Sequence, residues 1–156
     1  MRRSDRAVTD YNKMLAIVQA CDCCRLGLVD NGEAYIVALN FGFRDEAGQL
    51  ILYFHCATEG RKVNLFPRQK KVAFEMDARH ALDAADTACN FSFRYQCIMG
   101  IGELSILTDP AEKLDGLRRI LLHYSGKEEW PMTPQQAERV LVLKLTVTEW
   151  SCKEHQ

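Results

Sequence analysis

The sequence lacks several features that define large classes of proteins. Neither charge sign dominates, because 20 lysines and arginines face 21 aspartates and glutamates, giving a net charge of −1. Without a basic excess, non-specific binding to nucleic acid has no electrostatic support. The apolar runs, of which Leu50–Phe54 is typical, are far too short to span a membrane. No linker or repeat divides the 156 residues, so we expect one domain over 1–156 that binds neither nucleic acid nor membrane.

Common catalytic and targeting signatures are also missing. No Gly-x-Gly-x-x-Gly follows a strand, so a Rossmann dinucleotide site is unsupported. No Gly-x-Ser-x-Gly elbow is present, which removes the commonest serine hydrolase signature. The segment Met1–Arg6 is basic but is not followed by the apolar stretch of a signal peptide, so we expect a cytoplasmic protein.

Cysteine is abundant, with seven residues, yet it follows no pattern of disulfides or metal ligands. The number is odd, and most of the cysteines fall inside apolar patterns, which favours reduced, buried thiols. The cluster Cys21-Asp22-Cys23-Cys24 could begin a metal site, but no second Cys/His pair follows at finger-like spacing. We therefore expect no metal.

The most informative stretch is Gln49–Phe66. Its first part, Leu50–His55, is rich in β-formers and predicts a buried strand. Thr58 can cap a following helix over 58–66 whose first turn contains Gly60, Arg61 and Lys62. Cations are mildly unfavourable at a helix start, but a bound anion would reverse that effect. The strand, turn and helix therefore predict a phosphate-binding seat.

The rest of the chain predicts a mainly β protein with helices, of the α+β class. We expect an N-terminal arm at 1–8, a loop at 77–87, and a small closed or split barrel of six to seven mostly antiparallel strands with about four helices. The expected strands are 24–29, 34–43, 50–55, 72–76, 89–107 and 140–147, the first three forming a meander; the other expected helices are 9–22, 110–124 and a short one after Thr133.

The order of these pieces resembles a known family, the flavin-binding split barrels related to pyridoxamine 5′-phosphate oxidase, in the branch that contains the nitroimidazole-resistance (Nim-type) reductases. The most specific element is His-x-Ala-x-x-Gly-x-Lys at His55–Lys62. Weaker matches extend across nearly the whole chain: Met1-Arg2-Arg3 with Asp5-Arg6, Ile36–Gly42, Tyr53–Phe54, Arg94–Ile98 with Gly100 and Gly102, and Asp109–Lys113.

The resemblance implies an FMN-binding split barrel that forms a homodimer with two flavin sites at the subunit interface; FAD in place of FMN is left open. It implies that Arg61 and Lys62, after Gly60, meet the phosphate. His55 and Ala57 would lie beside the ribityl chain and ring. The remaining contacts would come from two strands: Val37, Ala38, Leu39 and Asn40 at the ring edge, and Tyr95, Gln96 and Cys97 at the interface.

The chain departs from the family pattern at two places, with Ala38 where proline is usual and Gln96-Cys97 where Ser-Val is usual. Each candidate site residue also has a purely structural explanation. His55 could satisfy a strand-end carbonyl, and Arg61 with Lys62 could be solvated surface charges. Asn40 needs a hydrogen-bond partner that a neighbouring backbone could supply.

The resemblance implies a flavin-dependent oxidoreductase. The flavin would receive a hydride from NAD(P)H and pass electrons to a small molecule such as a nitroaromatic. His55, as the catalytic candidate, could donate a proton or bind an anionic ligand near the ring. Two alternatives remain: a flavin-binding module that stores or senses the cofactor without turnover, and haem binding on a related barrel.

Overall fold

The computed structural model describes residues 3–156 as one curled antiparallel sheet with four α-helices packed around it. The strands are β1 Ala7–Val8, β2 Cys24–Asp30, β3 Glu33–Leu39, β4 Phe41–Glu46, β5 Gln49–Cys56, β6 Lys71–Asp83, β7 Ser92–Leu107 and β8 Leu141–His155. The helices are α1 Tyr11–Ala20, α2 Arg61–Leu65, α3 Pro110–Ser125 and α4 Pro134–Glu138. Short 3₁₀ turns occupy Ser4–Arg6, Phe66–Arg68 and Ala88–Asn90.

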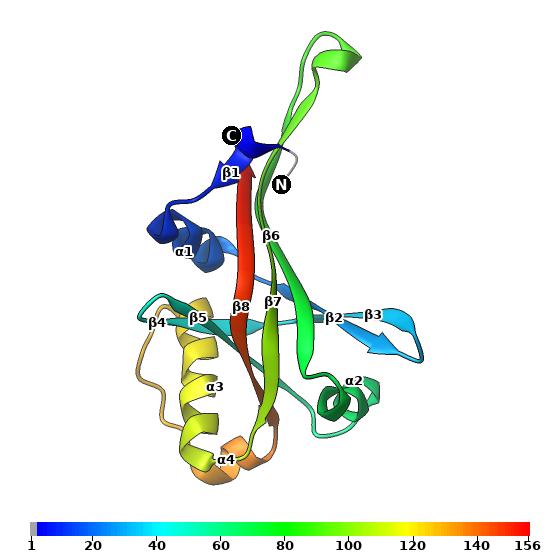
Figure 1. Ribbon diagram of the computed structural model, residues 1–156. Coiled ribbons are helices and arrows are strands. Elements are labelled where there is room, and N and C mark those ends of the chain that lie inside the picture. Colours follow the sequence, from blue (N-terminus) through cyan, green and yellow to red (C-terminus); the bar gives the residue numbers. More distant parts are fainter. Residues whose placement is uncertain (1–2) are drawn as a thin grey trace.

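The sheet order is β3-β2-β6-β7-β8-β5-β4, with β1 paired to β8 (Figure 1). Although β3 and β4 lie at opposite ends of this order, Val37 of β3 and Phe41 of β4 belong to the same buried core. The sheet therefore curls around that core and leaves a split between β3 and β4. This is the predicted split-barrel architecture, with eight strands in place of the expected six to seven.

Helix α3 covers the outer side of β4 and β5 at close range (Figure 1). The approach depends on two buried glycines, Gly42 on β4 and Gly116 on α3. A Cβ atom on Gly42 would lie 2.2 Å from the backbone carbon of Arg119, and one on Gly116 would lie 2.9 Å from the ring of Tyr53. The helix is capped at Asp109, whose side chain accepts from two backbone N–H groups, and it ends at the left-handed Gly126.

The expected strand over 34–43 is wrong as a single unit. It divides at Asn40 into β3, which pairs with β2, and β4, which pairs with β5. The expected meander is therefore two separate hairpins at opposite edges of the sheet, joined by one residue that crosses the split. Asn40 is exposed there, so no neighbouring strand has to satisfy its side chain.

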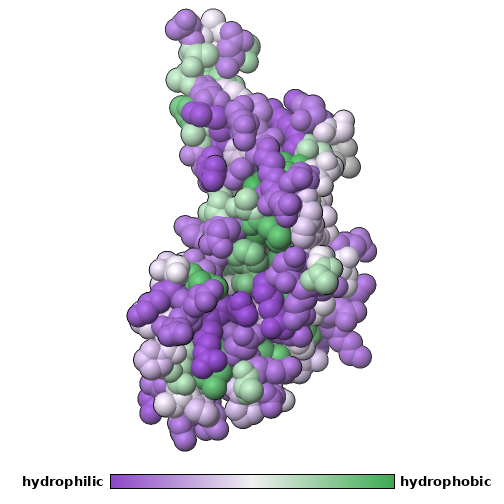
Figure 2. All heavy atoms as spheres, turned by 90° about the vertical axis from the view of Figure 1, so that its left-hand side faces the viewer, coloured by the Kyte–Doolittle hydropathy of each residue, from purple (hydrophilic) through white to green (hydrophobic). Residues whose placement is uncertain are grey.

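The expected loop at 77–87 is also wrong, because β6 continues to Asp83 and pairs with β7 as far as Ser92. The two strands form a long hairpin that stands clear of the body (Figures 1 and 2). Strand β8 likewise continues to His155, well beyond the expected end at 147. Strands β7 and β8 shift register at Ile101/Gly102, as a β-bulge does.

Only the end of the expected N-terminal arm, Ala7–Val8, is part of the sheet. Met1 and Arg2 lie outside the described residues, whereas Ala7 and Val8 pair with Lys153 and Cys152 of β8. Among residues 3–156, no helix is both long and apolar enough to cross a membrane.

Candidate functional site

His55 lies near the end of β5 and is half-buried. Burial lowers the pKa of its imidazole, which favours the neutral form. Its Nδ1 atom is buried and, within residues 3–156, has no hydrogen-bond partner. Because a buried polar atom without a partner costs free energy, this nitrogen is a candidate ligand contact.

The turn after β5 differs from the expected cap. Helix α2 begins at Arg61, and its N-cap is Gly60 rather than Thr58, with no side-chain cap hydrogen bond. Gly60 has φ 126° and ψ 170°, a conformation that only glycine adopts readily. The helix has only five residues, so its dipole alone is a weak basis for an anion seat. Ala57 and Gly60 are both exposed at this turn.

The two cations of α2 have different surroundings. The Nε atom of Arg61 donates to Oδ2 of Asp30 at 2.7 Å, and its guanidinium lies 4.2 Å from the centre of the Tyr35 ring. These contacts hold α2 against the β2–β3 hairpin. Lys62 is half-buried and makes no ion pair with any other described residue. Burial raises the pKa of the nearby Cys56 thiol, and the charge of Lys62 partly offsets that effect. Lys62 is therefore the cation available for an anionic ligand.

The predicted ring-edge residues lie on β3 at the split in the barrel. Val37 and Leu39 point into the core, while Ala38 and Asn40 are exposed. Of the described strands, only β2 pairs with β3, so the backbone groups along its other edge have no strand partner. An unpaired edge of this kind offers hydrogen bonds to a ligand or to another chain. Tyr35, which stacks on Arg61, is three residues from Ala38, roughly 10 Å along the strand.

The third predicted group lies on β7 and points to two sides of the sheet. Gln96 is buried on the inner side, where its Nε2 donates to Oε2 of Glu154 at 3.1 Å and its Oε1 has no partner within residues 3–156. Tyr95 and Cys97 point outward. The Tyr95 hydroxyl accepts a long hydrogen bond, 3.4 Å, from Arg6. A hollow of about 210 Å³ lies beside Cys97 and is lined by Met99, Ser151 and Lys153.

One chain brings only some of these groups together. Ala38 pairs with Arg25, Arg25 with Glu75, and Glu75 with Met99, so the β3 and β7 groups share one outer face. His55, in contrast, pairs with Val142, which pairs with Leu107. Leu107 is ten residues from Cys97 along β7, a separation of roughly 30 Å. The predicted site is therefore divided between the two ends of the sheet.

Sequence reasoning missed a charged cluster on the outer face beside Cys97. Arg25 Nη1 contacts Oε2 of Glu75 at 3.0 Å and also pairs with Asp77. The Nε2 atom of His80 lies 2.8 Å from Oδ2 of Asp77. The available signal was the alternation of Glu75 and Asp77 with the apolar residues of β6, which the expected loop at 77–87 obscured.

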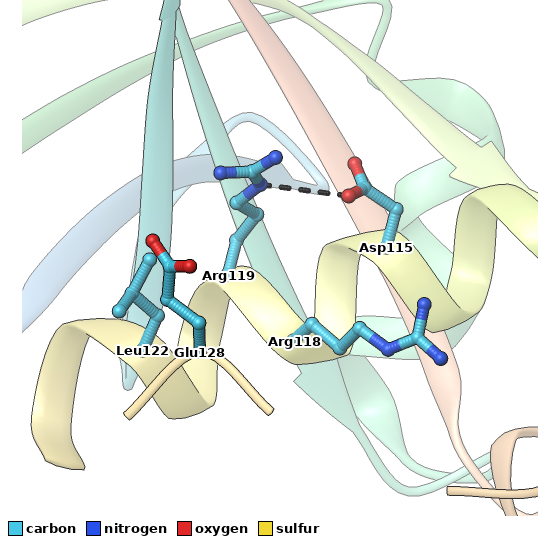
Figure 3. Close-up of a pocket in the computed structure, with 5 residues that line it drawn as sticks. All are labelled: Asp115, Arg118, Arg119, Leu122 and Glu128. Carbon is cyan, nitrogen blue, oxygen red and sulfur yellow. Dashed lines mark ion pairs between the residues drawn. The ribbon is translucent and has the colours of Figure 1, made fainter. Parts of the chain in front are cut away.

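A second hollow of about 290 Å³, at the base of the β6–β7 hairpin, is lined by the predicted residues Tyr95 and Gln96 together with Arg94 and His155. Another hollow, on α3, contains none of the predicted residues. Figure 3 shows this hollow of about 190 Å³, where Arg119 Nε lies 3.5 Å from Asp115 Oδ1 and Arg118 and Glu128 extend along its rim. The two arginines balance the two carboxylates, and Leu122 is the one apolar residue among the described residues that line the hollow. Within residues 3–156, no cluster of three or more His, Cys, Asp or Glu side chains could hold a metal ion.

Comparisons with known proteins add a family and a set of similar folds. Residues 10–154 match the family described as Pyridoxamine 5′-phosphate oxidase. A Bacteroides thetaiotaomicron structure provisionally described as a 5-nitroimidazole antibiotic resistance protein is 27% identical, with a TM-score of 0.81 over 95% of this chain and 86% of that one. Among curated proteins, none matches the chain significantly.

Two further structures show the same fold at lower identity. The flavocytochrome Anf3 from Azotobacter vinelandii is 22% identical, with a TM-score of 0.78 over all of this chain and 72% of that one. A Mycobacterium smegmatis protein described as FAD- and heme-binding is 20% identical, with a TM-score of 0.78 over 97% of this chain and 74% of that one.

Proposed function

Because the chain belongs to the pyridoxamine 5′-phosphate oxidase family, we propose that it binds a flavin and uses it as an oxidoreductase. The observation that carries the proposal is the set of polar groups left without partners at predicted site residues. These are the buried His55 Nδ1 and the ammonium of Lys62. Together with the unpaired edge of β3, they supply the donors and acceptors that a flavin ring and its phosphate need.

The arrangement of these residues fits a flavin. Lys62 would hold the phosphate, with Arg61 kept close by its contacts with Asp30 and Tyr35. From Tyr35, the edge of β3 leads to Ala38, where backbone groups would meet the ring. Because alanine replaces the proline usual at that position in the family, this chain retains a backbone N–H there for such a contact.

When bound, the flavin supplies hydride and single-electron transfer that no protein side chain provides. The contribution of the chain is to bind, orient and tune. Because burial lowers the pKa of His55, its imidazole is neutral at pH 7 and holds one proton on one nitrogen while the other accepts. Met99 and Ile101, exposed on the outer face, would exclude water from the reacting side of the ring.

The division of the site between two ends of the sheet favours a homodimer. His55 and Lys62 of one chain can meet Tyr95–Cys97 only if those residues come from another copy. The exposed surface supports association, since the chain exposes 9379 Å² whereas a compact monomer of this mass exposes about 8,000 Å². The surplus exceeds the roughly 800 Å² that a standard interface takes from each partner.

The substrate and cofactor form are proposed by analogy with the similar structures. The protein described as a nitroimidazole resistance protein suggests a nitroaromatic or similarly small electron acceptor, with reduced nicotinamide as the donor. FMN is the proposed cofactor, and FAD, which the Mycobacterium smegmatis protein is described as binding, is the alternative form. The seven free cysteines suit a reducing compartment, so the proposal includes a cytoplasmic location.

The proposal is tested with two double variants in the same segment. Arg61→Ala/Lys62→Ala is expected to lose bound flavin, because it removes the available cation Lys62 and the Arg61 side chain beside it. The fold should be kept, because neither side chain lies in the core and the exposed ion pair of Arg61 with Asp30 contributes little to stability. The control, Arg68→Ala/Lys70→Ala, removes two exposed cations from the adjoining turn and is expected to keep its flavin. Absorbance spectra measure the bound flavin, and circular dichroism measures whether the fold is kept. Full flavin occupancy in the first variant would refute the phosphate seat.

A further inference from the structure

The hairpin formed by the end of β6 and the start of β7 projects from the body (Figures 1 and 2). We call residues 79–94 the arm. It begins where β6 shifts register between Ala78 and Ala81 and where Arg79 adopts a φ of 55°. Within the arm, β6 and β7 pair with each other as far as Asp83 and Ser92, and no other described strand pairs with either.

One face of the arm is apolar and exposed. Leu82 and Phe93 are opposite each other across the hairpin and are 60% and 48% exposed, and Phe91 is 47% exposed. On the other face, Arg94 Nε pairs with Oδ1 of Asp83 at 2.8 Å. Because strand residues alternate between faces, Phe93 lies on the same side of β7 as Met99. The apolar face of the arm thus continues the outer face that begins at Cys97.

The arm needs a partner to be stable in this form. A two-stranded hairpin without further packing is at best marginally stable in water. Its unpaired edges and exposed aromatic rings also form a surface of the kind that other chains recognise. Covering the arm would account for part of the surplus surface that the chain exposes relative to a compact monomer.

We propose that the arm packs its apolar face on a second copy of this chain, next to the cofactor seat of that copy. This inference rests on the proposed function, in which Tyr95–Cys97 of one chain meet His55 and Lys62 of another. Tyr95 directly follows the arm along β7. If Tyr95 lies beside the Lys62 of the second copy, the arm must continue over the surface of that copy beyond the phosphate seat.

The geometry also explains why the arm is apolar on one face only. The side that continues from Cys97 and Met99 faces the second copy, while the side that carries the Asp83–Arg94 ion pair faces water. The arm would therefore act as a clasp that adds contacts to the dimer and narrows the path by which flavin leaves.

The test compares two double variants on opposite faces of the arm. Leu82→Ser/Phe93→Ser is expected to weaken the dimer roughly 100-fold or more, because the dimer loses four apolar contacts of the kind that anchor interfaces. The control, Asp83→Ser/Arg94→Ser, places the same serines on the other face and is expected to leave the dissociation constant within about threefold, since exposed ion pairs contribute little. Sedimentation velocity over a concentration series measures the dimer dissociation constant of each variant.

A truncation provides a second measurement that does not depend on new serines. Replacing 82–93 with Asn-Gly closes Ala81 onto Arg94 with a favoured hairpin turn and leaves the body intact. We expect this variant to be monomeric at micromolar concentration and to release flavin faster. A native chain that is monomeric, or a truncated chain that dimerises as tightly as the native one, would overturn the inference. Flavin content, measured on the same samples, tests the proposed function separately.

Discussion

The substitution Gly60→Ala tests the turn that presents Arg61 and Lys62. With φ 126° and ψ 170°, Gly60 occupies a region that costs other residues about 1–3 kcal/mol. A Cβ atom there would meet nothing within 4 Å, so the cost comes from backbone strain and not from a steric clash. For a chain of 156 residues, a loss of about 2 kcal/mol lowers the melting temperature by roughly 4–8 °C.

The strain also has a functional consequence. The chain can relieve it by rotating the peptide that leads into α2, which would move Arg61 away from Asp30 and change the position of Lys62. We therefore expect flavin affinity to fall together with the stability of the flavin-free protein. Differential scanning calorimetry on flavin-free samples and fluorescence titration with FMN measure the two effects independently.

Gly48→Ala is the matched control, because Gly48 also has a positive φ, 90°, and open space around it, but lies in the β4–β5 turn away from the predicted site residues. It is expected to destabilise the chain without changing flavin affinity. A Gly60→Ala variant that melts within 1 °C of the native chain, or a control that weakens flavin binding equally, would refute the reasoning.

Three further predictions concern the body of the protein. Gly42→Ala should destabilise the chain by about 3 kcal/mol or more in urea unfolding, because its Cβ would lie 2.2 Å from the α3 backbone. The control Gly27→Ala, whose Cβ would have no neighbour nearer than 3.7 Å, should change stability little. Equal losses of stability in the two variants would contradict this packing. Burial lowers the pKa of His55 and His123, so the unfolded chain binds more protons than the folded chain. The free energy of unfolding should therefore fall as the pH drops below about 6.5. A free energy of unfolding that stays constant from pH 7.5 to 5.5 would argue against this. Iodoacetamide should label at most three cysteines in the native protein and all seven in denaturant, because four of the seven are buried. Mass spectrometry counts the labelled cysteines. Rapid labelling of all seven in the native protein would contradict the burial of these four thiols.

Much of the architecture followed from local chemistry. The strands at 24–29 and 50–55 and the helix at 110–124 are confirmed because each depends mainly on neighbouring residues. The family resemblance is confirmed by the match over residues 10–154. In each case, a short pattern specifies the conformation strongly enough that distant contacts need not be known.

The errors arose where distant contacts decide the structure. The apolar run at 34–43 gives no sign that its two halves pair with different strands, because the split in the barrel is a property of the whole sheet. The segment 77–83 was expected to be a loop because much of the arm is exposed on both faces and shows no burial period. The helix start at Arg61 depends on the backbone conformation of Gly60 and on Asp30, which lies 31 residues away.

The candidate site, like the fold, could be predicted only in part from the sequence. The residue types and their order were readable from the sequence, but their distribution between two ends of the sheet was not. Nor could the sequence separate Arg61, which is held by Asp30 and Tyr35, from Lys62, which remains available. The distribution of the site residues requires the register of six strands joined by five pairings.

The most direct test of flavin binding is the absorbance spectrum of the purified protein, with the released cofactor identified by mass. We predict flavin absorption at close to one flavin per chain, with FMN as the released species. A colourless protein that also fails to take up added FMN or FAD would contradict it and leave only the split-barrel fold and its family.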